Sequence, residues 1–155
     1  MSTDSSFRIL PRVSDLNRHF WQGGERGELV FLRCQKCGTF VHPPQPICPV
    51  DYGKDLRPEA VSGRGTVATF TVNHQAWLPE MALPYVIALV TIDEQDDVRL
   101  QTNIVECDPD DVHIGLPVEV VFDHREDPGG DVWIPLFRPR TPAGPAANGG
   151  LDGHQ

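Results

Sequence analysis

Long hydrophobic runs are missing from this sequence. No apolar stretch approaches the ~18 residues that a membrane-spanning helix requires. The first residues, MSTDSSFRILPRVSD, also lack the apolar centre of a secretory signal peptide. We therefore expect a soluble, cytoplasmic chain with no membrane partner. In such a reducing compartment, closely spaced cysteines are metal ligands or free thiols more often than disulfides.

Positive charge is scarce in the second half of the chain. Residues 62–138 contain four arginines against fourteen acidic residues, a net charge of −10, whereas residues 1–61 have a net charge of +1. Binding to nucleic acid without strong sequence preference depends on Lys and Arg side chains that neutralise phosphates. The charge distribution therefore argues against a nucleic-acid-binding module, and we expect no nucleic-acid partner.

Proline and glycine, in contrast, are abundant. The 155 residues include 15 prolines and 14 glycines, which argues against a helical bundle and favours short strands joined by turns. The length suits one ordinary domain or two small ones. One short helix is predicted in the segment SDLNRHFWQGG, with Ser14 as its N-cap and Gly23 and Gly24 at its end.

The most specific motif is LRCQKCGTFVHPPQPICPVDYG. Cys34 and Cys37 form a Cys-x2-Cys knuckle followed by Gly38, and Cys48 and Asp51 repeat the same spacing with a carboxylate in the last place. Structural zinc sites are tetrahedral and commonly combine two such knuckles, and a carboxylate oxygen is also a zinc ligand. The pattern predicts that these three thiolates and one carboxylate bind zinc.

Several alternatives stay open for this motif. His42, in the loop between the knuckles, is a second candidate for the fourth ligand. The segment can also be a metal-free fold held by packing, or Cys34 and Cys37 can be a reduced dithiol. Cys107 lies far away in the segment ECDPDD, and we expect a lone thiol there.

The chain after Gly63 has the patterns of short strands. In GRGTVATFTVNH, one set of alternate residues includes Val67 and Thr69 and the other includes Ala68 and Phe70, which predicts a half-buried strand. The continuous apolar run LPYVIALVTID predicts a buried strand. An acidic turn and VRLQTNIVEC follow this run, which predicts a hairpin.

Two further strands are predicted in PVEVVFDH and DVWIPLFRPR. About five strands with one long connection, residues 75–84, fit a small Greek-key barrel of the OB type. The Pro, Ala and Gly-rich segment from residue 140 to the end is expected to be disordered.

The order of these motifs resembles that of a known family. The segments FWQGGERGELVFLRCQKCG, PPQPICP, GRGTVATFTV, PYVIALVTIDE, DVHIGLPVEVVF and PLFRP are similar to the rubredoxin-like zinc-ribbon plus OB-fold family, long described only as a domain of unknown function. The resemblance covers roughly residues 14–139, and Asp51 departs from it because the family's fuller pattern has a fourth Cys there. It implies a mainly β fold with four parts: a leader and short helix at 1–27, a zinc ribbon at 28–60, a five-stranded OB barrel at 61–139 and a disordered tail at 140–155.

The resemblance also implies a function. Members of this family are non-catalytic partners of thiolase-like enzymes, including thiolases, retro-aldolases and acyltransferases that act on acyl-CoA, and the partner subunit holds the catalytic residues. We therefore expect a hetero-oligomer with two copies of each subunit, in which this chain shapes the substrate channel. The sequence itself shows no nucleophile, base and orienting group in a recognisable arrangement, so we predict no catalytic residue.

Two groups of residues are candidates for contacts in that complex. The residues expected at the partner or substrate channel are Phe20, Trp21, His74, Trp77 and Tyr85. The residues expected to contact CoA phosphates are Arg33 and Lys36. The alternative for the first group is packing within the chain itself, and for the second it is ordinary solvated charge. A free-standing acyl-CoA-binding protein is the alternative function, and a nucleic-acid-binding OB module is a less favoured one.

Overall fold

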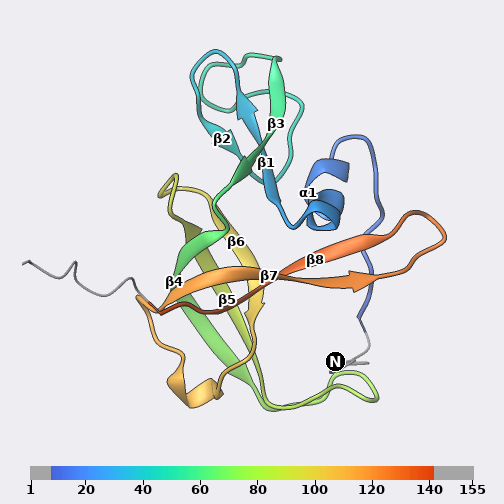
Figure 1. Cartoon of the computed structure of the whole chain (residues 1–155), viewed down its shortest axis with the longest axis vertical. Helices are drawn as coiled ribbons and strands as arrows, with labels where there is room; N and C mark the ends of the chain where they lie inside the picture. The colour runs from blue at the N-terminus through green and yellow to red at the C-terminus, as the bar shows by residue number, and fades with distance from the viewer. Residues whose placement is uncertain (1–7, 142–155) are drawn as a thin grey trace, which may run out of the picture.

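The computed structural model describes residues 8–141, so the predicted tail falls almost entirely outside the described residues. A three-stranded sheet in the order β2-β1-β3 lies at one end of the molecule (Figure 1). A closed barrel in the order β4-β5-β6-β8-β7 forms the rest, which is the strand order expected of an OB fold. The predicted fold, mainly β with a ribbon and a five-stranded barrel, is confirmed.

The N-terminal helix is shorter than its sequence pattern predicts. The helix α1 spans Arg18–Gln22, with Asn17 rather than Ser14 at its N-cap, and a 3-10 helix, η1, continues it through Gly23–Arg26. Ser14 contributes differently, because its carbonyl accepts hydrogen bonds from the amides of Asn17 and Arg18. Among residues 8–141 no helix is long and apolar enough to cross a membrane.

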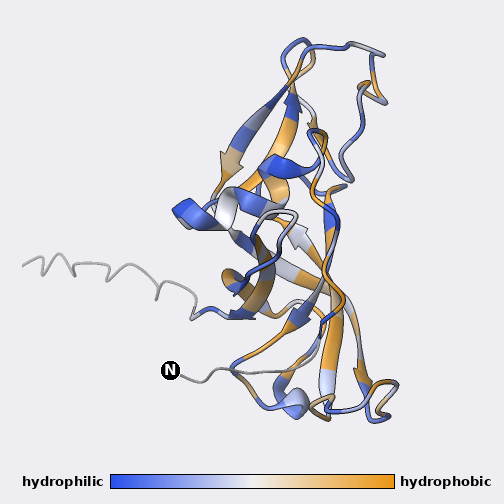
Figure 2. Cartoon of the chain, turned by 90° about the vertical axis from the view of Figure 1, so that its right-hand side faces the viewer, coloured by the Kyte–Doolittle hydropathy of each residue, from blue (hydrophilic) through white to orange (hydrophobic). Residues whose placement is uncertain are grey.

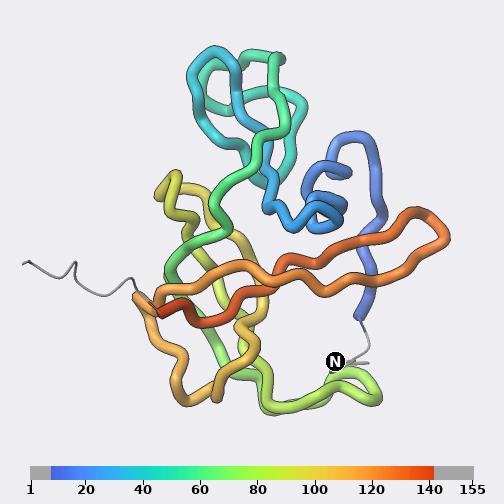
Figure 3. Tube along the Cα trace, in the orientation of Figure 1, coloured from blue at the N-terminus to red at the C-terminus, as the bar shows by residue number. Residues whose placement is uncertain are grey.

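The ribbon sheet consists of β1 (Leu29–Cys34), β2 (Phe40–Val41) and β3 (Leu56–Val61). Both neighbours pair with β1 in the antiparallel sense. The ribbon is fixed to the barrel by the side chain of Gln95, which accepts a hydrogen bond from the Phe40 amide at 2.8 Å and donates one to the Phe40 carbonyl at 3.0 Å. Figure 3 shows how β1 and β3 connect the ribbon to the rest of the chain.

The barrel strands follow in sequence and carry the hairpin that the sequence predicts. They are β4 (Arg64–Asn73), β5 (Tyr85–Ile92), β6 (Arg99–Ile104), β7 (Pro117–Arg125) and β8 (Val132–Pro139), with a 3-10 turn, η2 (Pro109–Asp111), before β7. The strands β5 and β6 pair in the antiparallel sense, and one parallel contact between β6 and β8 closes the barrel. Figure 2 shows that hydrophobic residues concentrate in the strands and that most connecting loops are hydrophilic.

A β-bulge changes the predicted alternation of β4. The pairing with β5 shifts between Val67 and Thr69, which places Ala68 as an extra residue. Beyond the bulge, Phe70 and Val72 therefore face the core together with Val67, and Thr69 is exposed. The prediction that Val67 and Thr69 share a face is wrong, because a single extra residue reverses the inward and outward positions.

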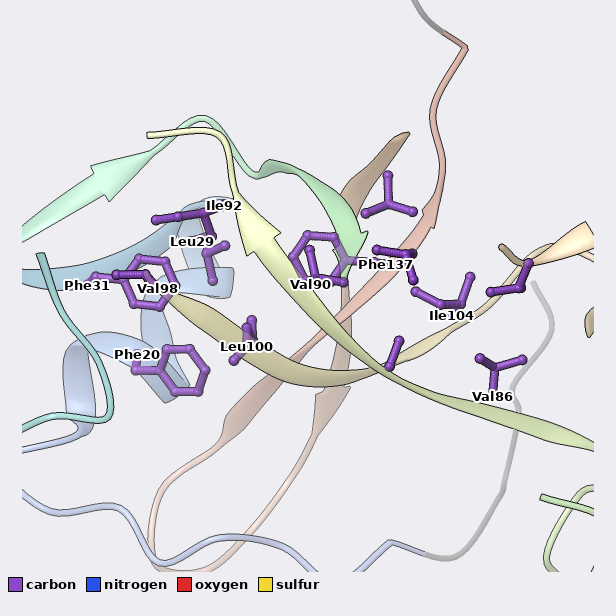
Figure 4. Packing of buried hydrophobic residues seen from close by; sticks show 14 of the residues in the cluster. Phe20, Leu29, Phe31, Val86, Val90, Ile92, Val98, Leu100, Ile104 and Phe137 are labelled. Atoms are coloured by element: carbon purple, nitrogen blue, oxygen red, sulfur yellow. The ribbon is translucent and has the colours of Figure 1, made fainter. Parts of the chain in front are cut away.

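One hydrophobic core joins helix, ribbon and barrel. Phe20 from α1 and Leu29 and Phe31 from β1 belong to the same buried cluster as the inward-facing residues of the barrel (Figure 4). This shared core fixes the ribbon and the helix against the barrel, and within it Phe20 of α1 packs on Phe31 of β1 with ring centroids 6.0 Å apart. It also places α1 and the N-terminal segment along one side of the barrel, where the cleft described below lies.

Candidate functional site

The first candidate site is the end of the ribbon where the two knuckles meet. In each knuckle the amide of the fifth residue donates to the carbonyl of the first: Gly38 to Cys34 and Tyr52 to Cys48, both at 2.9 Å. These turns aim the side chains of residues 34, 37, 48 and 51 toward one point. Their ligand atoms all lie within 4.8 Å of one another.

The spacing of these atoms fits a tetrahedral metal ion. Zinc–sulfur and zinc–oxygen bonds of about 2.3 and 2.0 Å imply S···S distances of about 3.8 Å and S···O distances of about 3.5 Å. The sulfurs of Cys37 and Cys48 are 3.7 Å apart, and the sulfur of Cys34 lies 3.5 and 3.6 Å from the two carboxylate oxygens of Asp51. A disulfide is excluded for these cysteines in the structure, because the sulfurs are free. The donor set therefore suits a divalent metal with soft ligands.

Local hydrogen bonds favour the deprotonated form of two of the four groups. The Gly53 amide donates to the Asp51 carboxylate at 2.8 Å, and this bond is the main cause of the lowered pKa of Asp51. Hydrogen bonding to Thr39 lowers the pKa of the Cys37 thiol. Metal ligands bind in their deprotonated form, so both effects assist binding.

His42 lies apart from this cluster. Its ring packs between Phe20 and Phe31, with centroids 4.8 and 4.9 Å away, at the junction of ribbon and helix. Burial, with a smaller contribution from His19, lowers the pKa of His42 to about 4. Within residues 8–141 its Nδ1 atom is buried without a hydrogen-bond partner. Its place in the aromatic cluster argues against His42 as the fourth ligand, and Cys107 is a half-buried thiol packed against the barrel core.

The second candidate site is a cleft of about 930 Å³ on the outer face of the barrel. Its floor comprises outward-facing side chains of β5 and β6, among them Ile87, Leu89 and Gln101. The segment 8–11, the helix α1, the loop 42–44 and part of β8 form its other walls, and the loop 78–82 lies at its edge. In OB folds this surface, on the second and third strands, is the usual ligand-binding face.

Only some of the predicted channel residues lie in this cleft. Phe20, Trp21 and Tyr85 line it, whereas His74 and Trp77 do not. Trp77 is 67% exposed on the long connection between β4 and β5, and its neighbour Leu78 contributes to the cleft instead. The structure therefore brings three of the five aromatic and histidine side chains together.

The sequence reasoning missed the floor of the cleft. The run LPYVIALVTID predicts a buried strand, but only alternate residues of β5 are buried. The others, Tyr85, Ile87 and Leu89, are half-buried and face outward into the cleft. The hydrophobic pattern does not show which side chains of β5 face outward, because the closure of the barrel decides this. A strand with apolar side chains on both faces also needs a contact that covers its outer face.

The N-terminal segment also contributes to the cleft, although the sequence predicts only a leader there. Arg8 forms an ion pair with Asp123 at 3.0 Å and donates a hydrogen bond to Asn103 at 3.1 Å. These contacts hold the segment across the barrel beside the β7–β8 hairpin (Figure 3).

The two residues predicted for CoA phosphates lie on the ribbon. Arg33 donates hydrogen bonds to the Gly38 carbonyl and to Glu59, both at 2.9 Å, and stacks over the ring of Phe40 at 4.8 Å. The Arg33 guanidinium therefore makes all of these contacts within the ribbon. Lys36 is exposed in the first knuckle. Neither residue lines the cleft.

Comparison with known proteins identifies both parts of the chain. The description "ChsH2, rubredoxin-like zinc ribbon domain" matches residues 21–57, and "ChsH2, C-terminal OB-fold domain" matches residues 58–123. A solved chain described as "Ltp2-ChsH2(DUF35) aldolase" superposes with a TM-score of 0.70 and 37% identity, over 84% of this chain and 98% of that chain.

Two curated relatives are also similar over most of the chain. A DUF35 domain-containing scaffold protein of Methanocaldococcus jannaschii is 39% identical over 109 residues, which are 69% of this chain and 76% of the relative. A probable enoyl-CoA hydratase alpha subunit of Thermomonospora curvata is 36% identical over 88% of this chain, but the match spans only 41% of that longer protein. The chain belongs to the ChsH2 family of rubredoxin-like zinc-ribbon and OB-fold proteins, also described as DUF35 proteins.

Proposed function

We propose that this protein is a non-catalytic accessory subunit that forms a hetero-oligomer with a thiolase-like enzyme acting on acyl-CoA substrates. In this complex the cleft on β5 and β6 forms part of the wall of the substrate channel. Relatives named as a scaffold protein, as hydratase alpha subunits and as part of an aldolase support an accessory role. The structural observation that carries the proposal is the apolar cleft itself.

The composition of the cleft is unusual for a solvent-facing surface. The outward side chains of β5 are Tyr85, Ile87 and Leu89, and Ile134 of β8 adds to the same surface. Contiguous apolar surface of this kind on a soluble protein marks a binding site. A volume of about 930 Å³ lies within the range of small-molecule sites, which suits an acyl group held between two subunits.

The charge of the cleft favours an apolar occupant over a nucleic acid. Single-strand binding requires a basic groove combined with stacking aromatic side chains. The arginines that line the cleft are Arg8 and Arg99, and Arg8 is already paired with Asp123. Two arginines, one of them neutralised, do not make a groove that follows a phosphate backbone.

The metal that we propose for the ribbon is zinc, with Cys34, Cys37, Cys48 and Asp51 as its ligands. Four protein ligands leave no open coordination position, which is typical of a structural site. Bound there, zinc would supply folding energy by crosslinking the two knuckles. The ribbon has few buried hydrophobic side chains beyond β1 and β2, so such a crosslink would stabilise its distal end.

Co-expression tests the accessory role. The chain is produced together with the thiolase-like protein encoded nearest to it, and size-exclusion chromatography with light scattering gives the stoichiometry. We expect co-elution as a complex with two copies of each subunit, and acyl-CoA turnover that requires both chains. A chain that elutes alone, or a partner with full activity on its own, would contradict the proposal.

The role of the cleft is tested within that complex. Replacing Ile87, on the cleft floor, with Asp puts a charge on the apolar surface, and we expect KM for the acyl-CoA to rise at least about tenfold while the complex still forms. Ile114→Asp is the matched control, because Ile114 is exposed outside the cleft. Unchanged saturation kinetics for Ile87→Asp would show that the substrate does not use this surface.

A further inference from the structure

The second knuckle of the ribbon has a tyrosine where the first knuckle has a glycine. Gly38 follows the last ligand of the first knuckle and has a φ of 78°. Tyr52 follows the last ligand position of the second knuckle and has a φ of 61°. Both amides donate to the carbonyl of the first knuckle residue at 2.9 Å, so the two turns are equivalent.

This left-handed conformation is unfavourable for a tyrosine. Glycine adopts it without strain because it has no Cβ, whereas an L-residue brings its Cβ close to the following carbonyl. A bulky aromatic residue in this region is an outlier, and such outliers cluster at functional sites. The strain is therefore evidence that the side chain of Tyr52 serves a purpose at this position.

Packing within the chain does not explain the tyrosine. Its side chain is 78% exposed, and among residues 8–141 it has no hydrogen bond, ion pair or ring contact. The small buried part of the ring therefore contributes little stability that could offset the strain of the backbone. A contact with another molecule would compensate for this strain.

Tyr52 lies in a short segment with two other exposed apolar residues. Val50, 61% exposed, belongs to the same turn, in which its amide donates a hydrogen bond to the Cys48 sulfur at 3.4 Å, and Ile47, 40% exposed, directly precedes this turn. Lys54 and Lys36 are exposed nearby, and neither forms an ion pair within residues 8–141. We call Ile47, Val50 and Tyr52 the ribbon tip; their segment, residues 47–52, belongs to the ribbon at the end of the molecule away from the barrel (Figure 1).

We propose that the ribbon tip is a docking element that inserts Tyr52 into an apolar pocket, edged by carboxylates, on the partner enzyme subunit. This inference rests on the proposed function and names a contact surface separate from the cleft. None of the three ribbon-tip residues lines the cleft, and tyrosine is enriched among the residues that anchor protein–protein interfaces by filling pockets. The two unpaired lysines beside an apolar centre match an acidic rim around such a pocket.

The proposal predicts opposite effects of Tyr52→Gly on stability and on binding. Removal of the strain is expected to raise the melting temperature of the isolated chain by about 2–4 °C, with unchanged metal content by elemental analysis. Loss of the anchor is expected to weaken binding to the thiolase-like partner at least about tenfold in titration calorimetry. Tyr52→Phe keeps the ring and is expected to bind within about threefold of the wild type.

Matched variants separate this inference from the accessory role itself. Val50→Ser is expected to weaken binding, and Ile114→Ser, an exposed apolar residue on the segment after η2, is expected to leave it unchanged. Wild-type binding with equally tight binding by Tyr52→Gly would overturn the docking role and leave the accessory role intact. No binding by the wild type would overturn both. Tyr52-dependent sedimentation with phosphatidylcholine and phosphatidylserine vesicles would assign the tip to a membrane surface and overturn the proposal.

Discussion

The buried His42 makes the stability of the fold depend on pH. The imidazole lies between the rings of Phe20 and Phe31, and burial lowers its pKa to about 4 from an ordinary value of 6.5. His19, whose pKa burial also lowers, is the ionisable neighbour that contributes to this shift. The folded state therefore favours the neutral form of His42.

The sign and size of the effect follow from proton linkage. Between pH 6.5 and 4 the unfolded chain binds a proton at residue 42 and the folded chain does not, so the free energy of unfolding falls as the pH falls through this window. From pH 7 to pH 5 the loss due to this one group is about 2 kcal/mol. Acid below pH 4 adds little more from His42, because both states are then protonated.

The variant His42→Phe isolates this contribution. Phenylalanine fills the same aromatic cluster and has no proton to gain, so we expect the free energy of unfolding of the wild type to fall about 2 kcal/mol further than that of the variant between pH 7 and 5. Urea unfolding followed by tryptophan fluorescence measures both proteins. Loss of metal at low pH is expected in both proteins, so the difference between the two curves reports residue 42 together with its interaction with His19.

Two results would refute this reasoning. The first is a pair of parallel stability curves for the wild type and His42→Phe between pH 7 and 5. The second is an NMR titration of the His42 ring in the folded protein with a midpoint near 6.5. Either result would mean that the imidazole is charged in the folded state and that the aromatic cluster opens to solvent.

Two further predictions concern the ribbon and its attachment to the barrel. Asp51→Ala removes one of the four proposed ligand groups and should speed metal release to a chromophoric chelator at least about tenfold. Asp51→Cys, which supplies a thiolate, should retain the metal at least as long as the wild type. Equal release rates for Asp51→Ala and the wild type would exclude Asp51 as a ligand. Gly24→Ala places a Cβ 2.6 Å from a ring carbon of Phe122 and even closer to Trp133, so the free energy of unfolding should fall by about 1–3 kcal/mol in thermal unfolding. An unchanged melting temperature would show that η1 moves freely against the β7–β8 hairpin.

Local sequence patterns predicted the elements of this fold because each pattern acts over a few residues. Two ligand residues separated by two others form a knuckle whatever the rest of the fold. An acidic turn between two apolar runs likewise predicts a hairpin. Both were found as predicted, with β5 and β6 paired as a hairpin and the ligand atoms of Cys34, Cys37, Cys48 and Asp51 gathered at one point. The N-cap and the face of Thr69 were wrong, because hydrogen bonds at the helix start and a one-residue bulge leave no clear mark in a hydrophobic pattern.

The sequence by itself determined the ribbon knuckles and the approximate positions of the barrel strands, since spacing and alternation encode them directly. The order of its motifs indicated the family by resemblance. The tertiary structure alone decided the cleft, because its walls come from segments as distant as Arg8, Tyr85 and Ile134, which meet only when the barrel closes and the ribbon docks. It also decided the meaning of Tyr52. A tyrosine at this position is not unusual in the sequence. Only its left-handed backbone conformation and its exposure show that the backbone is strained there and that packing within the chain does not offset the strain.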